Sequence, residues 1–319
     1  MPQPMSELIK TVGLKKYFET PSGWLHAVDD INMVIEKGRT LGVVGESGCG
    51  KSTLGRVLLH LLTASDGEIY FEGKDILKYN KHQIKALKKE MQIIFQDPYS
   101  SLNPRMSVSE IIAEPLKVTG AVRGKENIAK RVSELMETVG LAERLATAYP
   151  HELDGGRRQR IGVARALAVN PKFIVCDEPV SALDVSIQAQ ILNLLMNLQR
   201  DFGLTYMFIT HDLSVVKHIS HDIAVMYLGQ NVEKCDSETM FKNPLHPYTK
   251  ALLASIPLPR LNRSVVQQEV IRGELTSPIN PKPGCRFAAR CPIAEERCTK
   301  DNVPLVEYEP GHFVACVKY

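Results

Sequence analysis

The chain has 319 residues, 44% of them hydrophobic, enough to bury the core of one large domain and a smaller one. Its 39 basic and 36 acidic residues give a formal net charge of +3, which argues against a nucleic-acid partner and indicates an ordinary mixed surface. No apolar run approaches the ~20 residues of a membrane-spanning helix, and residues 1–4 carry no signal-peptide pattern. The composition predicts a soluble, intracellular, globular protein.

Before residue 90 the sequence alternates short strand-like runs with glycine turns. The runs cover residues 25–35, 38–45 and 67–71. Apolar runs bounded by glycines are typical of strands in a buried or half-buried sheet. We therefore expect β structure in this part of the chain.

A glycine-rich loop at residues 45–53 is the most specific motif. It fits G-x-x-x-x-G-K-[ST], follows the apolar run 41–44 and precedes the helix-like run 54–59. In this context the glycines let backbone N–H groups converge on phosphates at the positive end of a helix. The alternative, a purely structural loop, does not account for a lysine and a serine at these positions. We expect Lys51 to reach the β- and γ-phosphates of a nucleotide and the Ser52 hydroxyl to ligate Mg²⁺. The loop residues expected at the nucleotide are Gly45, Ser47, Gly48, Cys49, Gly50, Lys51, Ser52 and Thr53.

The sequence pattern changes from strand-like to helical after the strand-like run 91–95, which is followed by Gln96. The Gln96 amide is placed to reach both a metal ion and an attacking water. Beyond it, apolar residues recur at helical spacing over 108–116 and 128–136. We therefore expect a helical region from about residue 97 to residue 156.

Two acids end a second apolar run, 173–178. A carboxylate at the carboxyl end of a buried strand lies where an α/β sheet presents its ligands. We expect Asp177 to hold Mg²⁺ through water and Glu178 to polarise the attacking water as general base. The simpler alternative is a strand that ends in solvated acids. A third run, 204–210, leads to His211, which either senses the γ-phosphate or has a structural role.

The seven cysteines form two sets. Cys49 and Cys176 are expected to be small buried apolar side chains, and Cys235 has no evident role. Four others lie near the C-terminus, in a segment with too little apolar material to fold without a staple. They are Cys285, Cys291, Cys298 and Cys316.

The spacing of these four cysteines bears on what they bind. The paired C-x₂₋₄-C pattern of structural zinc sites is absent from the sequence, whereas a 4Fe–4S cluster suits four thiolates at less restricted spacing. We expect the cluster, with zinc as one alternative and free thiols or a disulfide as the other. His312 is the candidate to replace one of the four cysteine ligands.

In this order the motifs resemble the nucleotide-binding subunit of an ATP-binding-cassette (ABC) transporter, over nearly the whole chain. In that family's terms residues 45–53 are the Walker A loop and 176–178 close the Walker B strand. Gln96 matches the Q-loop glutamine and His211 the switch histidine. The resemblance adds Asp184 as the D-loop residue. It also implies that an aromatic side chain stacks on adenine, and the candidates are Phe18 first and Tyr17 second.

Two further segments, 185–192 and 243–250, resemble the oligopeptide and dipeptide importer branch of the family. The resemblance implies ATP hydrolysis that powers peptide uptake; the alternatives are import of nickel or oligosaccharides, or a non-transport ABC ATPase. It implies that the chain lies at the cytoplasmic face of the membrane and has four partners: a second, homologous ATPase, two permease subunits and an extracytoplasmic solute-binding protein. Members of this branch can carry a 4Fe–4S cluster in the C-terminal region.

The signature segment departs from the family pattern Leu-Ser-Gly-Gly-Gln. In ABC dimers the signature serine and glycine amides of one chain donate hydrogen bonds to the γ-phosphate bound by the other. An ionised aspartate can only accept, and at ~4 Å it is repelled by about 4 kcal/mol per phosphate charge at an effective dielectric of roughly 20. Either Asp154 is the N-cap of the signature helix, with Arg157 and Arg158 offsetting its charge, or the signature is degenerate and the partner ATPase is a different chain. The segment reads Leu153, Asp154, Gly155, Gly156 and Arg157.

We expect an α/β fold: a P-loop ABC ATPase core with an antiparallel β subdomain, a helical subdomain and a small cysteine-rich C-terminal region. The expected domains are the ABC nucleotide-binding domain, 1–255, and an oligopeptide-importer-type region, 256–319.

Overall fold

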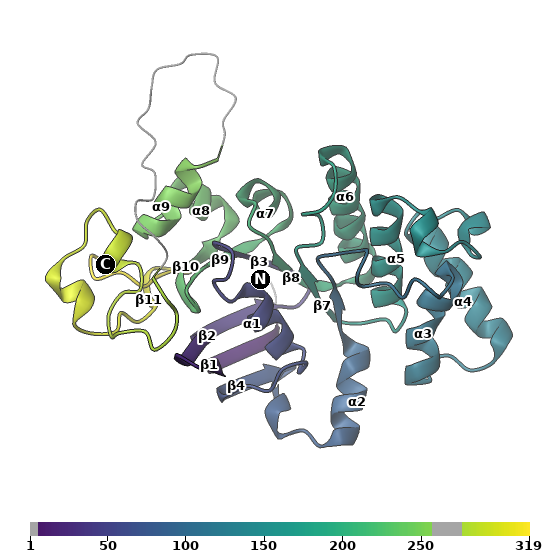
Figure 1. Cartoon of the computed structure of the whole chain (residues 1–319), viewed down its shortest axis with the longest axis horizontal. Coiled ribbons are helices and arrows are strands. Elements are labelled where there is room, and N and C mark those ends of the chain that lie inside the picture. Colours follow the sequence, from purple (N-terminus) through teal and green to yellow (C-terminus); the bar gives the residue numbers. More distant parts are fainter. Residues whose placement is uncertain (1–5, 257–275) are drawn as a thin grey trace, which may run out of the picture. The chain divides into compact units, whose positions relative to one another are not determined.

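The computed structural model describes residues 6–256 and 276–319, which form two compact units (Figure 1). Unit 1 contains residues 6–8, 35–39 and 78–209, and unit 2 contains the rest. None of the helices in these residues is long and apolar enough to cross a membrane. The expected boundary after residue 255 stays a prediction, because 257–275 lie outside the described part of the chain.

Unit 1 is built on three parallel strands, which lie in the order β8-β7-β6. Every residue of β7 and β8 is buried, as expected for the apolar runs of a parallel sheet. Helices α3, α4 and α5 pack against one another (Figure 1). Helices α3 and α4 lie inside the expected helical region, α5 lies almost entirely beyond it, and the bounds of that region stay a prediction. The elements of unit 1 are α2 (Lys81–Glu90), β6 (Met91–Ile94), α3 (Val108–Thr119), α4 (Lys125–Thr138), α5 (Gly155–Leu167), β7 (Phe173–Asp177), α6 (Val185–Phe202) and β8 (Thr205–Ile209).

Unit 2 contains most of an antiparallel sheet in the order β2-β1-β4-β5, the expected β subdomain. It also contains five strands in the order β11-β12-β10-β9-β3, in which β3 and β9 are parallel and the others antiparallel. Its elements are β1 (Glu7–Thr20), β2 (Gly23–Glu36), β3 (Thr40–Val44), α1 (Lys51–Leu58), β4 (Asp66–Phe71), β5 (Lys74–Asp75), α7 (Leu213–Ile219), β9 (Asp222–Tyr227), β10 (Gln230–Asp236), α8 (Ser237–Lys242), α9 (Pro247–Ala254), β11 (Val306–Glu309) and β12 (His312–Val314).

The C-terminal residues join unit 2 in two ways. The hairpin β11–β12 extends the sheet, because β12 pairs with β10. Phe287 is buried in the same apolar cluster as Tyr227 and Tyr248. The sequence analysis carried no expectation for this hairpin, whose strands are only four and three residues long.

Five 3₁₀ turns complete the described structure: Ile76–Lys78, Glu143–Leu145, Pro150–Glu152, Ala288–Arg290 and Glu296–Thr299.

Candidate nucleotide-binding site

The phosphate loop lies between β3 and α1, as predicted, and its glycines are required by contacts with the backbone. A Cβ on Gly45 would lie 2.1 Å from the Met226 carbonyl oxygen, and one on Gly50 2.0 Å from that of Ala27. Both glycines have positive φ, a conformation that L-residues rarely adopt. The loop is therefore held against β2 and β9 by approaches that leave no room for a side chain.

The Lys51 side chain folds back over this loop and is 5% exposed. Its ammonium Nζ donates to the carbonyl oxygens of Gly45 at 2.7 Å and Glu46 at 3.0 Å. Beneath it Cys49 is buried, and burial raises the pKa of its thiol. The buried Cys176 thiol on β7 likewise has a raised pKa, again because of burial. Both cysteines are therefore protonated apolar fillers, as expected, and the loop's positive charge belongs to Lys51.

A carboxylate that the sequence analysis did not single out belongs to the same loop. Arg290 binds the Glu46 carboxylate through both guanidinium NH₂ groups, Nη1 to Oε2 at 2.8 Å and Nη2 to Oε1 at 3.1 Å. The Glu46 backbone N–H donates to the Tyr248 hydroxyl at 2.9 Å. These partners lie more than two hundred positions away in the sequence, and no local pattern points to them.

The two aromatic candidates for adenine stacking are neighbours on β1 and so point to opposite faces of the strand. The Tyr17 ring stacks on His26 with centroids 3.8 Å apart, and its hydroxyl donates to the Asp29 carboxylate. The Lys16 ammonium lies 4.9 Å from the centroid of the Phe18 ring. The structure thus gives Tyr17 a defined polar environment, and the choice between the two stays a prediction.

Asp29 is the centre of this environment and was also missed. Burial pushes its pKa upward, but hydrogen bonds from Tyr17 and His26 and the charge of Arg286 together hold the pKa below its usual value. Arg286 also donates to the Leu228 carbonyl oxygen. A second arginine of the C-terminal segment therefore reaches the nucleotide-binding part of unit 2.

In unit 1 the structure brings Gln96 and Glu178 together. Asp177 is the last, buried residue of β7, and Glu178 follows it with φ of +47°. A non-glycine residue in this left-handed region costs about 1–2 kcal/mol, and the bond from its N–H to the Ile209 carbonyl oxygen, 2.9 Å, holds it there. The Gln96 amide Nε2 donates to the Glu178 carboxylate Oε2 at 3.0 Å. Strain of this kind is typical of functional positions, and the amide orients the expected base.

Asp154 is the N-cap of α5, as the first of the two signature interpretations predicted. Its carboxylate accepts a hydrogen bond from the Arg157 backbone N–H at 2.8 Å and lies 3.4 Å from the Arg157 guanidinium. The expectation that Arg158 also offsets this charge is wrong. Arg158 is buried, with its guanidinium 3.7 Å from the Tyr99 ring centroid and Nε donating to the Pro150 carbonyl oxygen. These contacts, and not Asp154, hold its guanidinium.

The signature glycines pack against the chain's own D-loop. A Cβ on Gly155 would lie 3.0 Å from a Leu183 methyl group, and one on Gly156 2.7 Å from a methyl group of Ile187. Asp184, the expected D-loop residue, is the N-cap position of α6. These two expected site segments are therefore neighbours within unit 1, which their sequence spacing did not reveal.

The expected site residues are divided between the two units. Gln96, Asp177 and Glu178 belong to unit 1, with the signature and D-loop segments, whereas Lys51, Ser52 and His211 belong to unit 2. His211 lies between β8 and α7, one residue before Asp212, whose carboxylate caps α7 through the Ser214 N–H at 2.8 Å. The roles assigned to these residues stay predictions.

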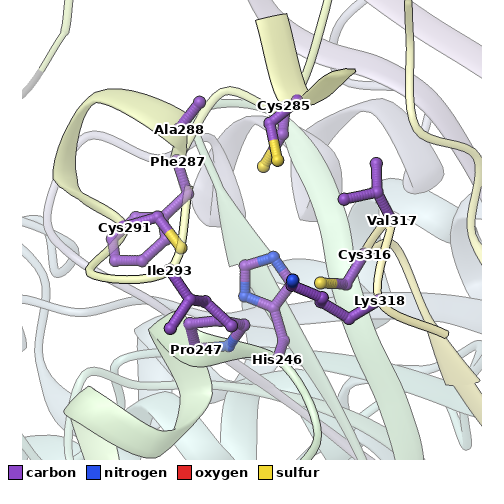
Figure 2. Close-up of a pocket in the computed structure, with 11 residues that line it drawn as sticks. His246, Pro247, Cys285, Phe287, Ala288, Cys291, Ile293, Cys316, Val317 and Lys318 are labelled. Atoms are coloured by element: carbon purple, nitrogen blue, oxygen red, sulfur yellow. The ribbon is translucent and has the colours of Figure 1, made fainter. Parts of the chain in front are cut away.

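The four C-terminal cysteines line one small pocket in unit 2, although up to seventeen residues separate consecutive members. Figure 2 shows the sulfur atoms of Cys285, Cys291 and Cys316 directed toward the space faced by the His246 imidazole. Cys298 lines the same pocket, and none of the four forms a disulfide.

The Glu295 backbone N–H donates to the Cys298 sulfur at 3.4 Å. The pKa of Cys285 is raised to about 11, mainly by burial and also by the neighbouring thiols, against the lowering effect of the nearby Phe287 backbone N–H. A thiolate set at this place therefore needs a positively charged partner to form near neutral pH.

The expectation that His312 could replace one of these ligands is wrong. Its Nε2 lies 2.8 Å from the Glu233 carboxylate in a separate buried cluster. The histidine that lines the cysteine pocket is His246, whose pKa burial lowers to about 3 and whose Nδ1 accepts from the Tyr248 N–H. His246 is therefore neutral, and His312 belongs to the junction between β10 and β12.

Known protein families match both the nucleotide-binding part and the C-terminal part of this chain. Residues 28–181 match the ABC transporter family model, and residues 232–298 match the model of the oligopeptide/dipeptide transporter C-terminal region. A putative oligopeptide transport ATP-binding protein of Bacillus subtilis is 49% identical over 314 residues, covering 98% of this chain and 95% of that protein. The chain belongs to the ABC transporter ATP-binding subunits, in the oligopeptide/dipeptide branch.

Other relatives of this ABC ATPase support the same placement. An oligopeptide transport ATP-binding protein of Escherichia coli is 49% identical over 308 residues, covering 95% of this chain and 91% of that protein. A dimeric ATP-binding cassette solved in a post-hydrolysis state with ADP and phosphate has a TM-score of 0.66 at 27% identity, covering 72% of this chain and 99% of that one. The predicted α/β ABC ATPase fold and the ATPase activity of the family are thereby confirmed for this chain.

Proposed function

We propose that this ABC ATPase powers the uptake of di- or oligopeptides. The observation that carries the proposal is the match of its C-terminal part to the oligopeptide/dipeptide transporter region, in a chain that aligns almost end to end with oligopeptide transport ATP-binding proteins. Import of nickel or oligosaccharides and a non-transport role are the alternatives that the test must separate.

The mechanism that we propose uses the roles that the family resemblance implies for these side chains. Lys51 and the loop amides bind the β- and γ-phosphates, and Ser52 and Asp177 are the residues that would hold Mg²⁺, which neutralises phosphate charge when bound. Glu178, oriented by Gln96, accepts a proton from the attacking water. His211 contacts the γ-phosphate and reports its loss. Binding of two ATP molecules closes a dimer, and hydrolysis reopens it.

This function requires partners: a second ATPase subunit, two permease subunits and an extracytoplasmic solute-binding protein, with the chain at the cytoplasmic face of the membrane. The test is to reconstitute this assembly in vesicles and to measure ATP-dependent uptake of labelled dipeptides, oligopeptides, nickel and maltooligosaccharides. Peptide uptake supports the proposal, uptake of another solute alone replaces the substrate, and ATP hydrolysis without any assembly at permeases contradicts the importer role.

The signature segment leads us to propose a different chain as the second ATPase. Asp154 is used as a helix cap and its charge is partly offset by Arg157, but it supplies no hydroxyl donor for a partner's γ-phosphate. Loss of one donor to developing charge typically costs about 10²-fold in rate. Changing Asp154→Ser together with Arg157→Gln is therefore expected to raise phosphate release by the assembled complex. Unchanged hydrolysis would show that the natural segment is fully competent.

We further propose that the four C-terminal cysteines hold a 4Fe–4S cluster, a group that would supply a compact structural crosslink at this pocket. The donor set fits, because four sulfurs line one pocket and a backbone N–H already donates to one of them, Cys298. A single zinc with ~2.3 Å bonds would draw the four sulfurs to about 3.8 Å from one another. In the described part of the chain, the group of ligand atoms that lies within 4.8 Å of one another is Glu233, Cys235 and His312, not these four.

The cluster proposal predicts about four irons and four sulfides per chain and absorption near 400 nm in anaerobically purified protein. Cys298→Ser should lose most of the iron, whereas Cys235→Ser, which removes a buried cysteine outside the pocket, should retain it. One zinc per chain would assign the pocket to zinc instead, and the absence of both metals would leave four thiols and end the proposal.

A further inference from the structure

The phosphate loop contains a negatively charged side chain, Glu46, and an arginine of the C-terminal segment holds its carboxylate in place. Glu46 is the residue after the first glycine of the loop. Its carboxylate is gripped at both oxygens by Arg290, whose side chain is 8% exposed, while the Tyr248 hydroxyl accepts from its backbone N–H. Paired guanidinium–carboxylate bonds of this kind fix orientation as well as charge.

The position of Lys51 shows why this charge matters. The Lys51 ammonium lies 3.0 Å from the carbonyl oxygen of Glu46 itself. Without Arg290, the Glu46 carboxylate would lose its paired cation, while the Lys51 ammonium stays bonded to the backbone of the same residue. It could then capture the ammonium that should bind phosphate, or leave an uncompensated negative charge beside the triphosphate, where like charges repel strongly.

Arg290 is not an isolated surface contact. It ends the 3₁₀ turn Ala288–Arg290, between Cys285 and Cys291, and also donates to the Tyr227 hydroxyl at 3.2 Å. Phe287 at the start of this turn packs edge-on against Tyr227, with ring centroids 5.3 Å apart. The segment that carries Arg290 is therefore itself packed against β9, which places the arginine side chain at the phosphate loop.

We propose that Arg290 is a positioning residue for nucleotide binding: by holding the Glu46 carboxylate away, it keeps Lys51 and the loop amides available for phosphate. The inference rests on the proposed binding of ATP by residues 45–53. It does not depend on which group the four cysteines hold. It makes the last part of the chain a requirement for the affinity of a site formed near its beginning.

The test measures binding of the non-hydrolysable analogue AMP-PNP and of ADP, with Mg²⁺, to the full chain by calorimetry. Arg290→Met is expected to weaken AMP-PNP binding about tenfold or more, and ADP binding less, because the repulsion grows with phosphate charge. The double variant Glu46→Gln with Arg290→Met is expected to return to within about threefold of the unaltered chain, because the charge that needed control is gone. Arg297→Met is the matched control: this arginine of the same segment pairs with Glu295 on the surface and should change nothing.

Rescue by Glu46→Gln is a readout that a merely structural role would not produce. If Arg290→Met binds AMP-PNP normally, or if the double variant stays as weak as the single one while both melt like the unaltered chain, the proposal is overturned. If Arg290→Met melts at a lower temperature, the double variant still decides, because recovered binding there supports charge control and continued loss contradicts it. Failure of the unaltered chain to bind nucleotide would instead refute the proposed function.

Discussion

A subunit carrying Glu178→Gln is expected to bind ATP with unchanged affinity and to lose about 10²- to 10⁴-fold in hydrolysis, the usual contribution of a positioned general base. The amide has nearly the same shape as the carboxylate and keeps an oxygen that can accept the hydrogen bond now made by Gln96 at 3.0 Å. What it loses is the ability to take a proton from water. Phosphate release and nucleotide binding, measured on the same preparation of the assembled complex, separate the two effects.

The same variant predicts a change of state. If ATP binding closes the dimer and hydrolysis reopens it, the Glu178→Gln complex should accumulate closed and ATP-bound, which size-exclusion chromatography with ATP can detect. Glu134→Gln, at an exposed position on α4, is the control for the loss of one carboxylate and should hydrolyse normally. Normal turnover by Glu178→Gln would require another residue to act as base.

The second large effect is expected for the buried pair of Glu233 and His312. Glu233 is 0% exposed, and its carboxylate accepts from the backbone N–H groups of Leu245 at 2.7 Å and His246 at 2.8 Å. His312, 2% exposed, lies 2.8 Å from the same carboxylate through Nε2. One carboxylate thus joins β10, the start of α9 and the C-terminal strand β12. Its three hydrogen bonds account for the close approach of Glu233 and His312, so this approach does not require a metal ion.

Breaking a buried pair by removing one partner leaves the other without compensation and typically costs about 3–5 kcal/mol. We expect His312→Ala to lower the free energy of unfolding by about this amount, measured by urea denaturation. Glu233→Gln should be similarly costly, because its NH₂ group would meet donors where an acceptor is needed.

His82→Ala, an exposed histidine on α2, is the control and should stay within about 0.5 kcal/mol of the unaltered chain. The double variant of Glu233 and His312 should cost less than the sum of the two single changes, because each removes the same interaction. Unchanged unfolding of His312→Ala would mean that the C-terminal hairpin docks without this pair.

The sequence by itself determined the features that depend on neighbours along the chain. The phosphate loop between β3 and α1, the acids at the end of β7 and the helices around residues 108–138 follow from local spacing and burial periodicity. The same holds for Asp154, since capping is decided by its own helix. The motifs found by these local rules are also the basis of the family resemblance, which the comparisons confirmed.

Only the tertiary structure decided which distant side chains share an environment. The pairing of Glu46 with Arg290, the pairing of Glu233 with His312 and the convergence of the four cysteines depend on how the last residues join the sheet through β12 and Phe287. The expectation for Arg158 was wrong for the same reason, since its buried position is set by contacts with Tyr99 and the Pro150 carbonyl oxygen. Charges and thiols carry no periodic signal, so their partners are set by packing between elements far apart in the chain.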